Sequence, residues 1–121
     1  MTNGRAKGAR GERELAEKLR EFGLTARRAQ QYCGVAGDSD LIVDELPGLL
    51  VECKRVERLH LEKAMTKAIE DSAKAGKIPV VCHRKNGGDW MITLRLDELS
   101  SVARMWLRAT GRGRAFAELP G

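Results

Sequence analysis

The stretch Leu49-Leu50-Val51-Glu52-Cys53-Lys54 decides how the rest of the chain is organised. Its branched and apolar residues predict a strand with at least one buried face. Because side chains alternate across a strand, Glu52 and Lys54 point to one side, and Leu49, Val51 and Cys53 point to the other. Burying a carboxylate and an ammonium costs several kcal/mol unless something compensates. The compensation is a partner charge, a metal ion or a role in chemistry.

Composition places the chain among soluble globular proteins with a highly charged surface. Apolar residues make up 42% and charged residues 32% of 121 residues, which suits one domain. No apolar run approaches the ~20 residues that span a bilayer, and the N-terminus has no signal-peptide core, so we expect a cytoplasmic protein. Three scattered cysteines without a Cys-x-x-Cys pair argue against a disulfide framework and a zinc site.

The charge balance favours a polyanionic partner. Twenty-two Lys and Arg residues against 17 Asp and Glu residues give a net charge of +5. Nucleic acid is therefore the first candidate partner. With aromatic residues at 4%, a platform that stacks successive single-stranded bases is not expected.

The elements follow in the order helix, strand, strand, strand, helix, strand, strand, helix. This order predicts an α/β fold with a mixed sheet of about five strands flanked by helices, because a helix between residues 54 and 78 suits a crossover connection. Residues 1–9 are expected to be a flexible basic segment and 109–121 a disordered Gly/Arg-rich tail, leaving 10–108 as the domain. The predicted helices cover 11–22, 61–75 and a last segment capped by Asp97; the predicted strands cover 24–31, 40–43, 49–54, 78–82 and 90–94.

A hairpin brings a second carboxylate to the central strand. Leu46-Pro47-Gly48-Leu49 predicts a type II turn, which joins the strand that begins at Asp40 to the strand of Glu52 and Lys54. With the turn centred on its Pro-Gly pair, Asp40 faces Arg55, and a shift of one residue keeps Asp40 near Glu52 and Lys54. Two carboxylates brought together repel unless one is protonated or a cation lies between them. Their hard oxygen atoms favour Mg²⁺ or Mn²⁺.

The first predicted helix contributes a third acidic residue. Its apolar stripe is Leu15, Leu19 and Phe22. Glu12 lies three residues before Leu15, at the start of this inward stripe, whereas Glu14 is expected to be solvated. An acid near a helix N-terminus is ordinarily a favourable interaction with the helix dipole, but an inward-facing Glu12 needs a group to face.

Taken in order, Glu12, Asp40 and the Glu52-x-Lys54 pair resemble the PD-(D/E)xK nuclease superfamily. The resemblance narrows to the archaeal-type Holliday junction resolvases and covers residues 7–94. Ser39 stands where the superfamily name has proline, and residues 73–75 lack the phenylalanines expected at the family's dimer interface. The matching segments are 7–15, 23–24 with Arg28, 39–42, 51–54 and 76–80.

This resemblance implies a restriction-endonuclease-like fold and a Mg²⁺-dependent endodeoxyribonuclease of DNA recombination and repair. Such a crossover junction endonuclease acts as a homodimer on branched double-stranded DNA, in the host-cell cytoplasm if a phage encodes it. Asp40, Glu52 and the main-chain carbonyl of Cys53 would hold Mg²⁺, with Mn²⁺ expected to substitute, and Glu12 would complete the metal shell. Lys54 would orient the attacking water. The implied DNA contacts are Lys7, Arg10, Arg13, Arg28 and Arg55.

Two other interpretations stay open. The first is another nuclease of the same superfamily, such as a restriction-like, repair or phage DNA-processing enzyme. The second is a non-catalytic basic DNA-binding module, in which Asp40, Glu52 and Lys54 form a structural ion-pair cluster.

Overall fold

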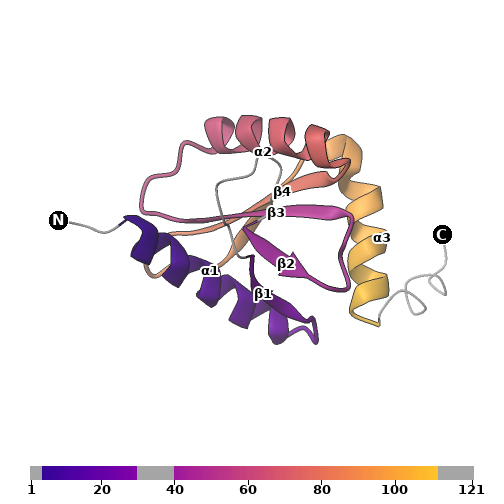
Figure 1. Ribbon diagram of the computed structural model, residues 1–121, viewed down its shortest axis with the longest axis horizontal. Helices are drawn as coiled ribbons and strands as arrows, with labels where there is room; N and C mark the ends of the chain where they lie inside the picture. The colour runs from indigo at the N-terminus through magenta and orange to yellow at the C-terminus, as the bar shows by residue number, and fades with distance from the viewer. Residues whose placement is uncertain (1–3, 30–39, 112–121) are drawn as a thin grey trace.

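A mixed sheet of five strands, in the spatial order β1-β2-β3-β4-β5, lies at the centre of the computed structural model, which describes residues 4–29 and 40–111 (Figure 1). The predicted α/β class is therefore confirmed. None of the described helices is both long enough and apolar enough to cross a membrane. In chain order the elements are α1 (Gly4–Arg20), β1 (Ala26–Arg28), β2 (Leu41–Val43), β3 (Leu49–Arg55), α2 (Leu61–Ala75), β4 (Ile78–Arg84), β5 (Met91–Thr93), a 3-10 turn η1 (Leu96–Glu98) and α3 (Leu99–Ala109).

β3 and β4 form the parallel centre of the sheet. They pair in register over seven residues, starting with Leu49 opposite Ile78, whereas the other neighbouring strands pair antiparallel. α2 connects the two strands, as a parallel crossover requires. Its bounds agree with the predicted helix, and Gly76 ends it in the left-handed conformation, at φ 66°. The predicted crossover is therefore confirmed.

Helices cover both faces of the sheet, so the protein has three layers (Figure 1). On one face, Leu50 and Val81 are fully buried against two alanines of α2. Because Leu50 faces α2, the alternation of β3 places Glu52 and Lys54 on the same side, as the sequence predicted. On the opposite face a larger cluster joins the sheet to α1 and α3, and its members include Leu15, Leu19, Val51, Val80 and Val102.

α1 begins earlier than predicted, at Gly4 rather than Gly11, and ends at Arg20. Residues 4–9, expected to precede the helix, form its first turns instead. Alanine, arginine and lysine alternate with the glycines here, and their helix preference offsets a cost of about 1 kcal/mol for each glycine. The predicted helix start is therefore wrong.

The turn between β2 and β3 differs from the predicted type II form. The Leu49 N–H donates to the carbonyl of Leu46 at 3.2 Å, so a turn closes at the expected place. Gly48, however, lacks the positive φ that a type II turn requires there. A preceding turn, in which the Leu46 N–H donates to the carbonyl of Val43 at 2.9 Å, moves the hairpin centre toward β2. The strand register therefore differs from the predicted one.

The 3-10 turn η1 changes the start of α3. Glu98 rather than Asp97 occupies the N-cap position, without a capping bond from its side chain, and it pairs with Arg95. The predicted cap at Asp97 is wrong because this residue is taken up in the 3-10 turn. Trp106 of α3 packs edge-on against Phe22 at a centroid distance of 5.1 Å, as part of the core. Residues 112–121 of the expected tail lie outside the described residues.

α1 approaches β3 closely at Gly11. A Cβ atom added to Gly11 would lie 2.5 Å from the Cβ and 3.3 Å from the Cγ of Arg55. These atoms lie next to the backbone of β3, so rotation of the arginine end cannot relieve the contact. The missing side chain of Gly11 therefore sets the spacing between α1 and β3.

Replacing Gly11 by Ala is expected to destabilise the protein by about 1–3 kcal/mol, because α1 must move away from β3. Gly8→Ala is the matched control, since nothing lies within 4 Å of its added Cβ. That variant should instead gain roughly 0.5–1 kcal/mol from its helix preference. Urea unfolding of the two variants measures the difference, and equal stabilities would contradict the close packing at Gly11.

Candidate active site

Asp40 and Glu52 lie beside each other at the junction of β2 and β3. Leu41 pairs with Val51, so Asp40, one residue earlier, lies next to Glu52 rather than across from Arg55. The Asp40 N–H donates to the Val51 carbonyl at 2.9 Å, and its Oδ2 accepts the N–H of Cys53 at 2.8 Å. The main chain of β3 therefore fixes the Asp40 carboxylate. The two acidic residues lie together as expected, although the strand register differs from the predicted one.

Glu52 is a buried carboxyl group in a sheet. Its exposed fraction is 4%. Of the described residues, Glu52 is the only one with an ionisable acidic or basic side chain that is buried in the core. Burial, then the charge of Asp40, then a hydrogen bond with that carboxylate raise the pKa of Glu52 to about 8. In the metal-free protein at neutral pH, the pair therefore holds a proton. Protonation of one carboxyl group is one of the two ways in which the repulsion between neighbouring carboxylates can be relieved.

Two lysines approach this pair from different elements. Lys54 is half-buried on β3, on the same side of the strand as Glu52, and has no salt bridge within the described part of the chain. Lys67 lies on α2, and its charge, like that of Lys54, partly offsets the rise in the pKa of Glu52. The sequence interpretation missed Lys67. It lies directly before the fully buried Ala68 of α2, and its exposed side chain also pairs with Asp71 at 3.7 Å.

Glu12 faces an arginine rather than the other two acids. Its Oε1 lies 2.8 Å from Nε of Arg28, and its side chain is 16% exposed. Across residues 4–29 and 40–111, no three His, Cys, Asp or Glu side chains gather closely enough to hold a metal ion. Asp40 and Glu52 alone still suit Mg²⁺, which proteins commonly hold by one or two carboxylates together with water. The role of Glu12 as a metal ligand stays a prediction.

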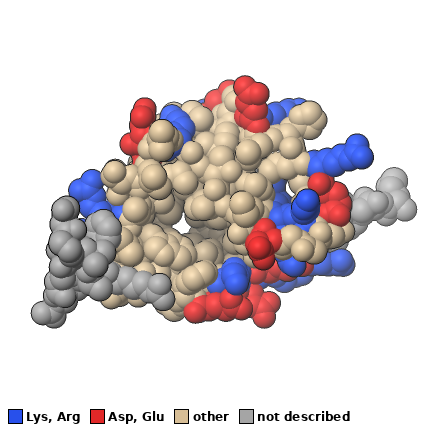
Figure 2. Space-filling model, turned by 180° about the vertical axis from the view of Figure 1, so that it is seen from behind, with Lys and Arg blue, Asp and Glu red and all other residues tan. Residues whose placement is uncertain are grey.

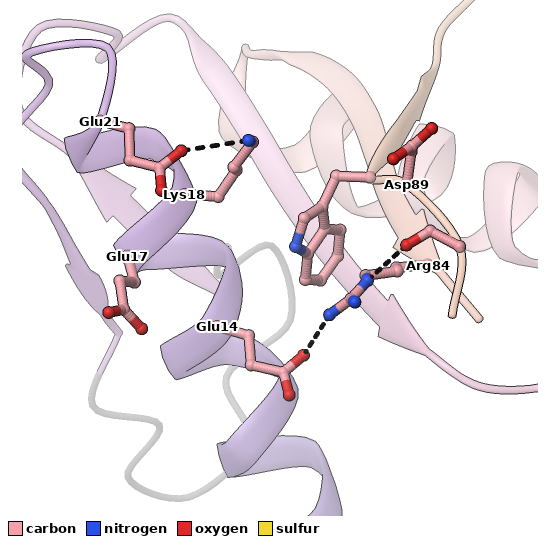
Figure 3. Close-up of a pocket in the computed structure, with 8 residues that line it drawn as sticks. Glu14, Glu17, Lys18, Glu21, Arg84 and Asp89 are labelled. Carbon is pink, nitrogen blue, oxygen red and sulfur yellow. Dashed lines mark hydrogen bonds and ion pairs between the residues drawn. The ribbon is translucent and has the colours of Figure 1, made fainter. Parts of the chain in front are cut away.

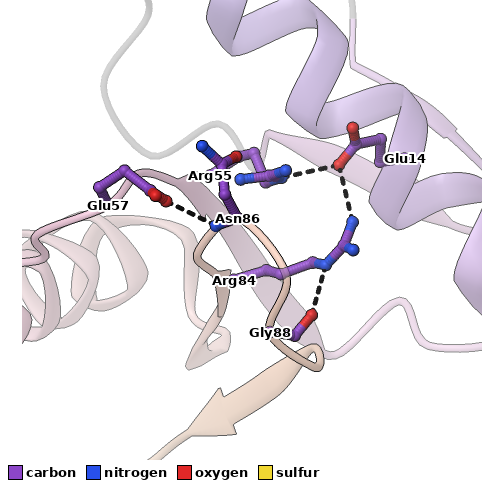
Figure 4. A network of polar contacts seen from close by, with 6 residues as sticks. All are labelled: Glu14, Arg55, Glu57, Arg84, Asn86 and Gly88. Carbon is purple, nitrogen blue, oxygen red and sulfur yellow. Dashed lines mark hydrogen bonds and ion pairs between the residues drawn. The ribbon is translucent and has the colours of Figure 1, made fainter.

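A charge network joins α1 to the two central strands (Figure 4). Oε2 of Glu14 lies 2.9 Å from Nε of Arg55 and 3.4 Å from Nη1 of Arg84. Glu14 is therefore an internal anchor, and its predicted solvation is wrong. Arg55, with 17% of its side chain exposed, is engaged inside the protein rather than presented to DNA. The prediction that Arg55 contacts phosphate therefore requires this ion pair to open.

The remaining predicted DNA contacts have different surroundings. Arg10 and Arg13 are exposed on α1, and Arg28 is exposed while paired with Glu12. Lys7 lies in the first turns of α1, and its side chain is outside the described part of the structure.

A hollow of about 540 Å³ lies beside α1 (Figure 3). Figure 3 shows Glu14 and Glu17 on α1 and Glu21 directly after it, with Lys18 paired to Glu21 and with Arg84 and Asp89 opposite. Arg84 is held by Glu14 and by the carbonyl of Gly88, so acidic groups dominate the hollow. This lining disfavours a phosphate backbone.

The thiols near the site favour their protonated form. Cys53 and Cys82 are free and occupy paired positions on β3 and β4. Burial, followed by the charge of Asp40, raises the pKa of Cys53, and burial raises the pKa of Cys82 to about 12. A thiol that stays protonated is a poor nucleophile, which agrees with the interpretation of Cys53 as a small apolar residue. Cys33 lies outside the described residues.

Replacing Glu52 by Gln is expected to stabilise the metal-free protein at alkaline pH. A carboxyl group with a pKa of 4.5 when unfolded and about 8 when folded contributes stability below pH 4.5 that is lost as pH rises through 8. A glutamine amide can donate to Asp40 at every pH. The free energy of unfolding of the variant, relative to wild type, should therefore rise by roughly 2–4 kcal/mol between about pH 5 and about pH 9.

Urea unfolding in the presence of a chelator, at both pH values, measures this difference. Glu70→Gln is the matched control because Glu70 is exposed on α2. Parallel pH profiles for wild type and Glu52→Gln would show that Glu52 does not carry the shifted pKa.

Comparison with solved structures finds the fold in the Holliday junction resolvase Hjc of the archaeal hyperthermophile Archaeoglobus fulgidus. The TM-score is 0.52 at 21% sequence identity, over 73% of this chain and 72% of the archaeal chain. The shared fold is the restriction-endonuclease-like α/β fold predicted from the sequence. The comparison with curated proteins finds no match.

A family model described as "Phage putative PDDEXK endonuclease" matches residues 3–110. The matched range contains Asp40, Glu52 and Lys54. Because it covers most of the 121 residues, the chain belongs to this family of phage PD-(D/E)xK endonucleases.

Proposed function

We propose that this protein is a Mg²⁺-dependent, structure-selective endonuclease that cuts four-way DNA junctions by paired, symmetric phosphodiester hydrolysis. The observation that carries the proposal is the contact between the half-buried Asp40 and the buried Glu52, with Lys54 on the same face of β3. A fold maintains a buried carboxyl group beside a second carboxylate only against a substantial electrostatic cost. A cation-dependent reaction would explain why the fold keeps the two carboxyl groups together despite this cost.

Asp40, Glu52 and the main-chain carbonyl of Cys53 are the groups that would hold the metal, with Mn²⁺ able to substitute. When bound, Mg²⁺ supplies a water of lowered pKa and charge compensation for the phosphate being cut. The Asp40 carboxylate stays oriented because Cys53 N–H donates to it at 2.8 Å. Glu52 would hold the metal in its ionised form, with its proton released to solvent.

Lys54 would orient the attacking water and favour its hydroxide form. Its half-buried position beside Glu52, without a salt bridge among the described residues, leaves its ammonium group available for this role. Glu12 would reach the metal directly or through water after releasing Arg28. Arg28 would then be available to a phosphate, as Arg10 and Arg13 are on the exposed side of α1.

The four-way junction is the proposed substrate because the archaeal protein with the same fold is a Holliday junction resolvase. The second candidate, another phage DNA-processing nuclease, is favoured by the family description, which specifies an endonuclease but no DNA structure. Incubating the purified protein and Mg²⁺ with end-labelled four-way junctions, flaps and linear duplexes decides between them. Paired symmetric nicks in the junction alone support resolution, whereas equal cutting of flaps or linear DNA supports the second candidate.

Asp40→Asn and Lys54→Ala are each expected to lower the rate of cleavage by roughly 100-fold or more, since each removes a group that stabilises the transition state. Junction binding should change little, because an asparagine oxygen can still accept the Cys53 N–H and Lys54 holds no salt bridge in the described structure. Single-turnover cleavage and gel-shift binding separate the two effects. Asp44→Asn and Lys74→Ala, both at exposed positions, are matched controls. Wild-type cleavage by either site variant would refute the site assignment.

Paired incision also leads us to propose a homodimer, because one chain has one site and a two-fold axis provides two. β5 is an edge strand, and beside it a groove of about 430 Å³ is lined by exposed apolar residues that include Phe22, Ile92 and Leu99. Figure 2 shows a broad central area without Lys, Arg, Asp or Glu on the face turned away from the viewer of Figure 1. An apolar groove next to an unpaired strand edge suits a second copy of the chain.

Leu99→Glu is expected to raise the dimer dissociation constant by roughly 100-fold or more, because it would bury an unpaired carboxylate in the contact. Sedimentation velocity over a concentration series measures the shift. Leu61→Glu is the matched control, since Leu61 is exposed on α2 and does not line the groove. A wild-type monomer, or equal dissociation of both variants, would argue against this dimer surface.

A further inference from the structure

A second hollow lies one strand away from Lys54, on the same side of the sheet. His83 of β4 is the register partner of Lys54, and Met91 of β5 is the register partner of His83. The three side chains therefore form a row across adjacent strands, which lie ~4.8 Å apart. The hollow, of about 360 Å³, opens above His83 and Met91, between the β3–α2 connection and the β4–β5 turn. The base of a nucleotide whose phosphate lies at Lys54 can therefore reach this hollow.

The lining of this hollow suits a flat heterocycle with polar edges. Val56, Leu59 and Met91 provide apolar walls, and the imidazole of His83 provides a planar surface. Lys85 and Asp89 are exposed at the rim, and in the described structure neither side chain has a salt-bridge partner. They offer a donor and an acceptor to the edge of a base. Asp89 would repel a phosphate, so the site favours a base over the DNA backbone.

Hydrogen bonds hold the two walls in place. The Asn86 N–H donates to Oε2 of Glu57 at 2.5 Å, which ties the β4–β5 turn to the β3–α2 connection (Figure 4). Nε of Arg84 donates to the Gly88 carbonyl at 2.6 Å and fixes the base of the same turn. His83 Nε2 lies 3.0 Å from the Thr93 hydroxyl, so its ring orientation is set. The hollow is therefore preformed, as small-ligand sites usually are.

We propose that this hollow is a subsite for one unstacked nucleobase of the DNA strand being cut, adjacent to the scissile phosphate. The inference rests on the proposed nuclease function and adds a source of structure selectivity to it. A base in a continuous duplex has its edge paired and its faces stacked, so it cannot enter, whereas a base at a branch point can leave its stack at lower cost. The subsite holds one base and so differs from an aromatic platform that stacks several.

Single-turnover cleavage of junctions that each carry one abasic residue tests this subsite. The abasic residue is placed in turn at each nucleotide flanking the scissile phosphate. For the wild type, one position should slow cleavage by roughly 5- to 100-fold, the scale of losing one stacked base, and the others should not. This scan needs no protein variant.

Leu59→Trp fills the hollow and should slow cleavage of the intact junction by a similar factor. In that variant, the abasic residue at the sensitive position should cause no further loss. Leu96→Trp is the matched control, because Leu96 is 81% exposed and lies outside the hollow. Lys85→Ala, at an exposed position that tolerates substitution, should also reduce the sensitivity to the abasic residue if Leu59→Trp fails to fold.

The outcomes separate the subsite from the function on which it rests. A wild type that cuts no DNA overturns the nuclease function and the subsite together. Normal cleavage of junctions at every abasic position overturns the subsite alone. The subsite is likewise overturned if Leu59→Trp keeps the full abasic effect, or if Lys85→Ala slows all substrates equally, as loss of a general phosphate contact would.

Discussion

The burial of Glu52 against Asp40 is the constraint on which the rest of the structure depends. The carboxyl group is 4% exposed, and both its burial and the Asp40 charge oppose its ionisation. Three features of the fold bring this about: the β2–β3 register, the β3 N–H that fixes Asp40, and the α2 layer above Glu52. An ordinary core would have an apolar residue at this position. The proposed cation site rests on this departure from an ordinary core.

Two acidic residues of α1 are neutralised within the protein. Glu12 pairs with Arg28 of β1, and Glu14 pairs with Arg55 of β3 and Arg84 of β4. These contacts hold α1 to three strands, while the absence of a side chain at Gly11 lets the helix approach β3. The two acidic residues at the β2–β3 junction are not neutralised in this way. The charges of Lys54 and Lys67 lower the pKa of Glu52, but burial and Asp40 keep it raised. In the metal-free protein at neutral pH, a proton on this pair is what relieves the repulsion between the two carboxyl groups.

The sequence was sufficient for features that follow from local periodicity. Alternation along 49–54 placed Glu52 and Lys54 on one face, and the apolar repeat with Gly76 gave the bounds of α2. It was insufficient for features that are determined by tertiary contacts or by backbone dihedral angles. The β2–β3 register depended on two successive turns, and the φ of Gly48 cannot be derived from its identity. The partners of Glu14 lie 41 and 70 residues away, beyond the reach of any local pattern.

Placing a lysine and a nucleobase subsite in one row of a sheet has a consequence for selectivity. Loops can change their distance from a catalytic group, but neighbouring strands in register keep a nearly constant spacing. Lys54, His83 and Met91 are joined by continuous backbone pairing, so the distance between phosphate and base would be fixed before DNA binds. A duplex could meet that distance only by unstacking a base. A rigid sheet would then discriminate branched from continuous DNA through the energy needed to deform the substrate, without reading its sequence.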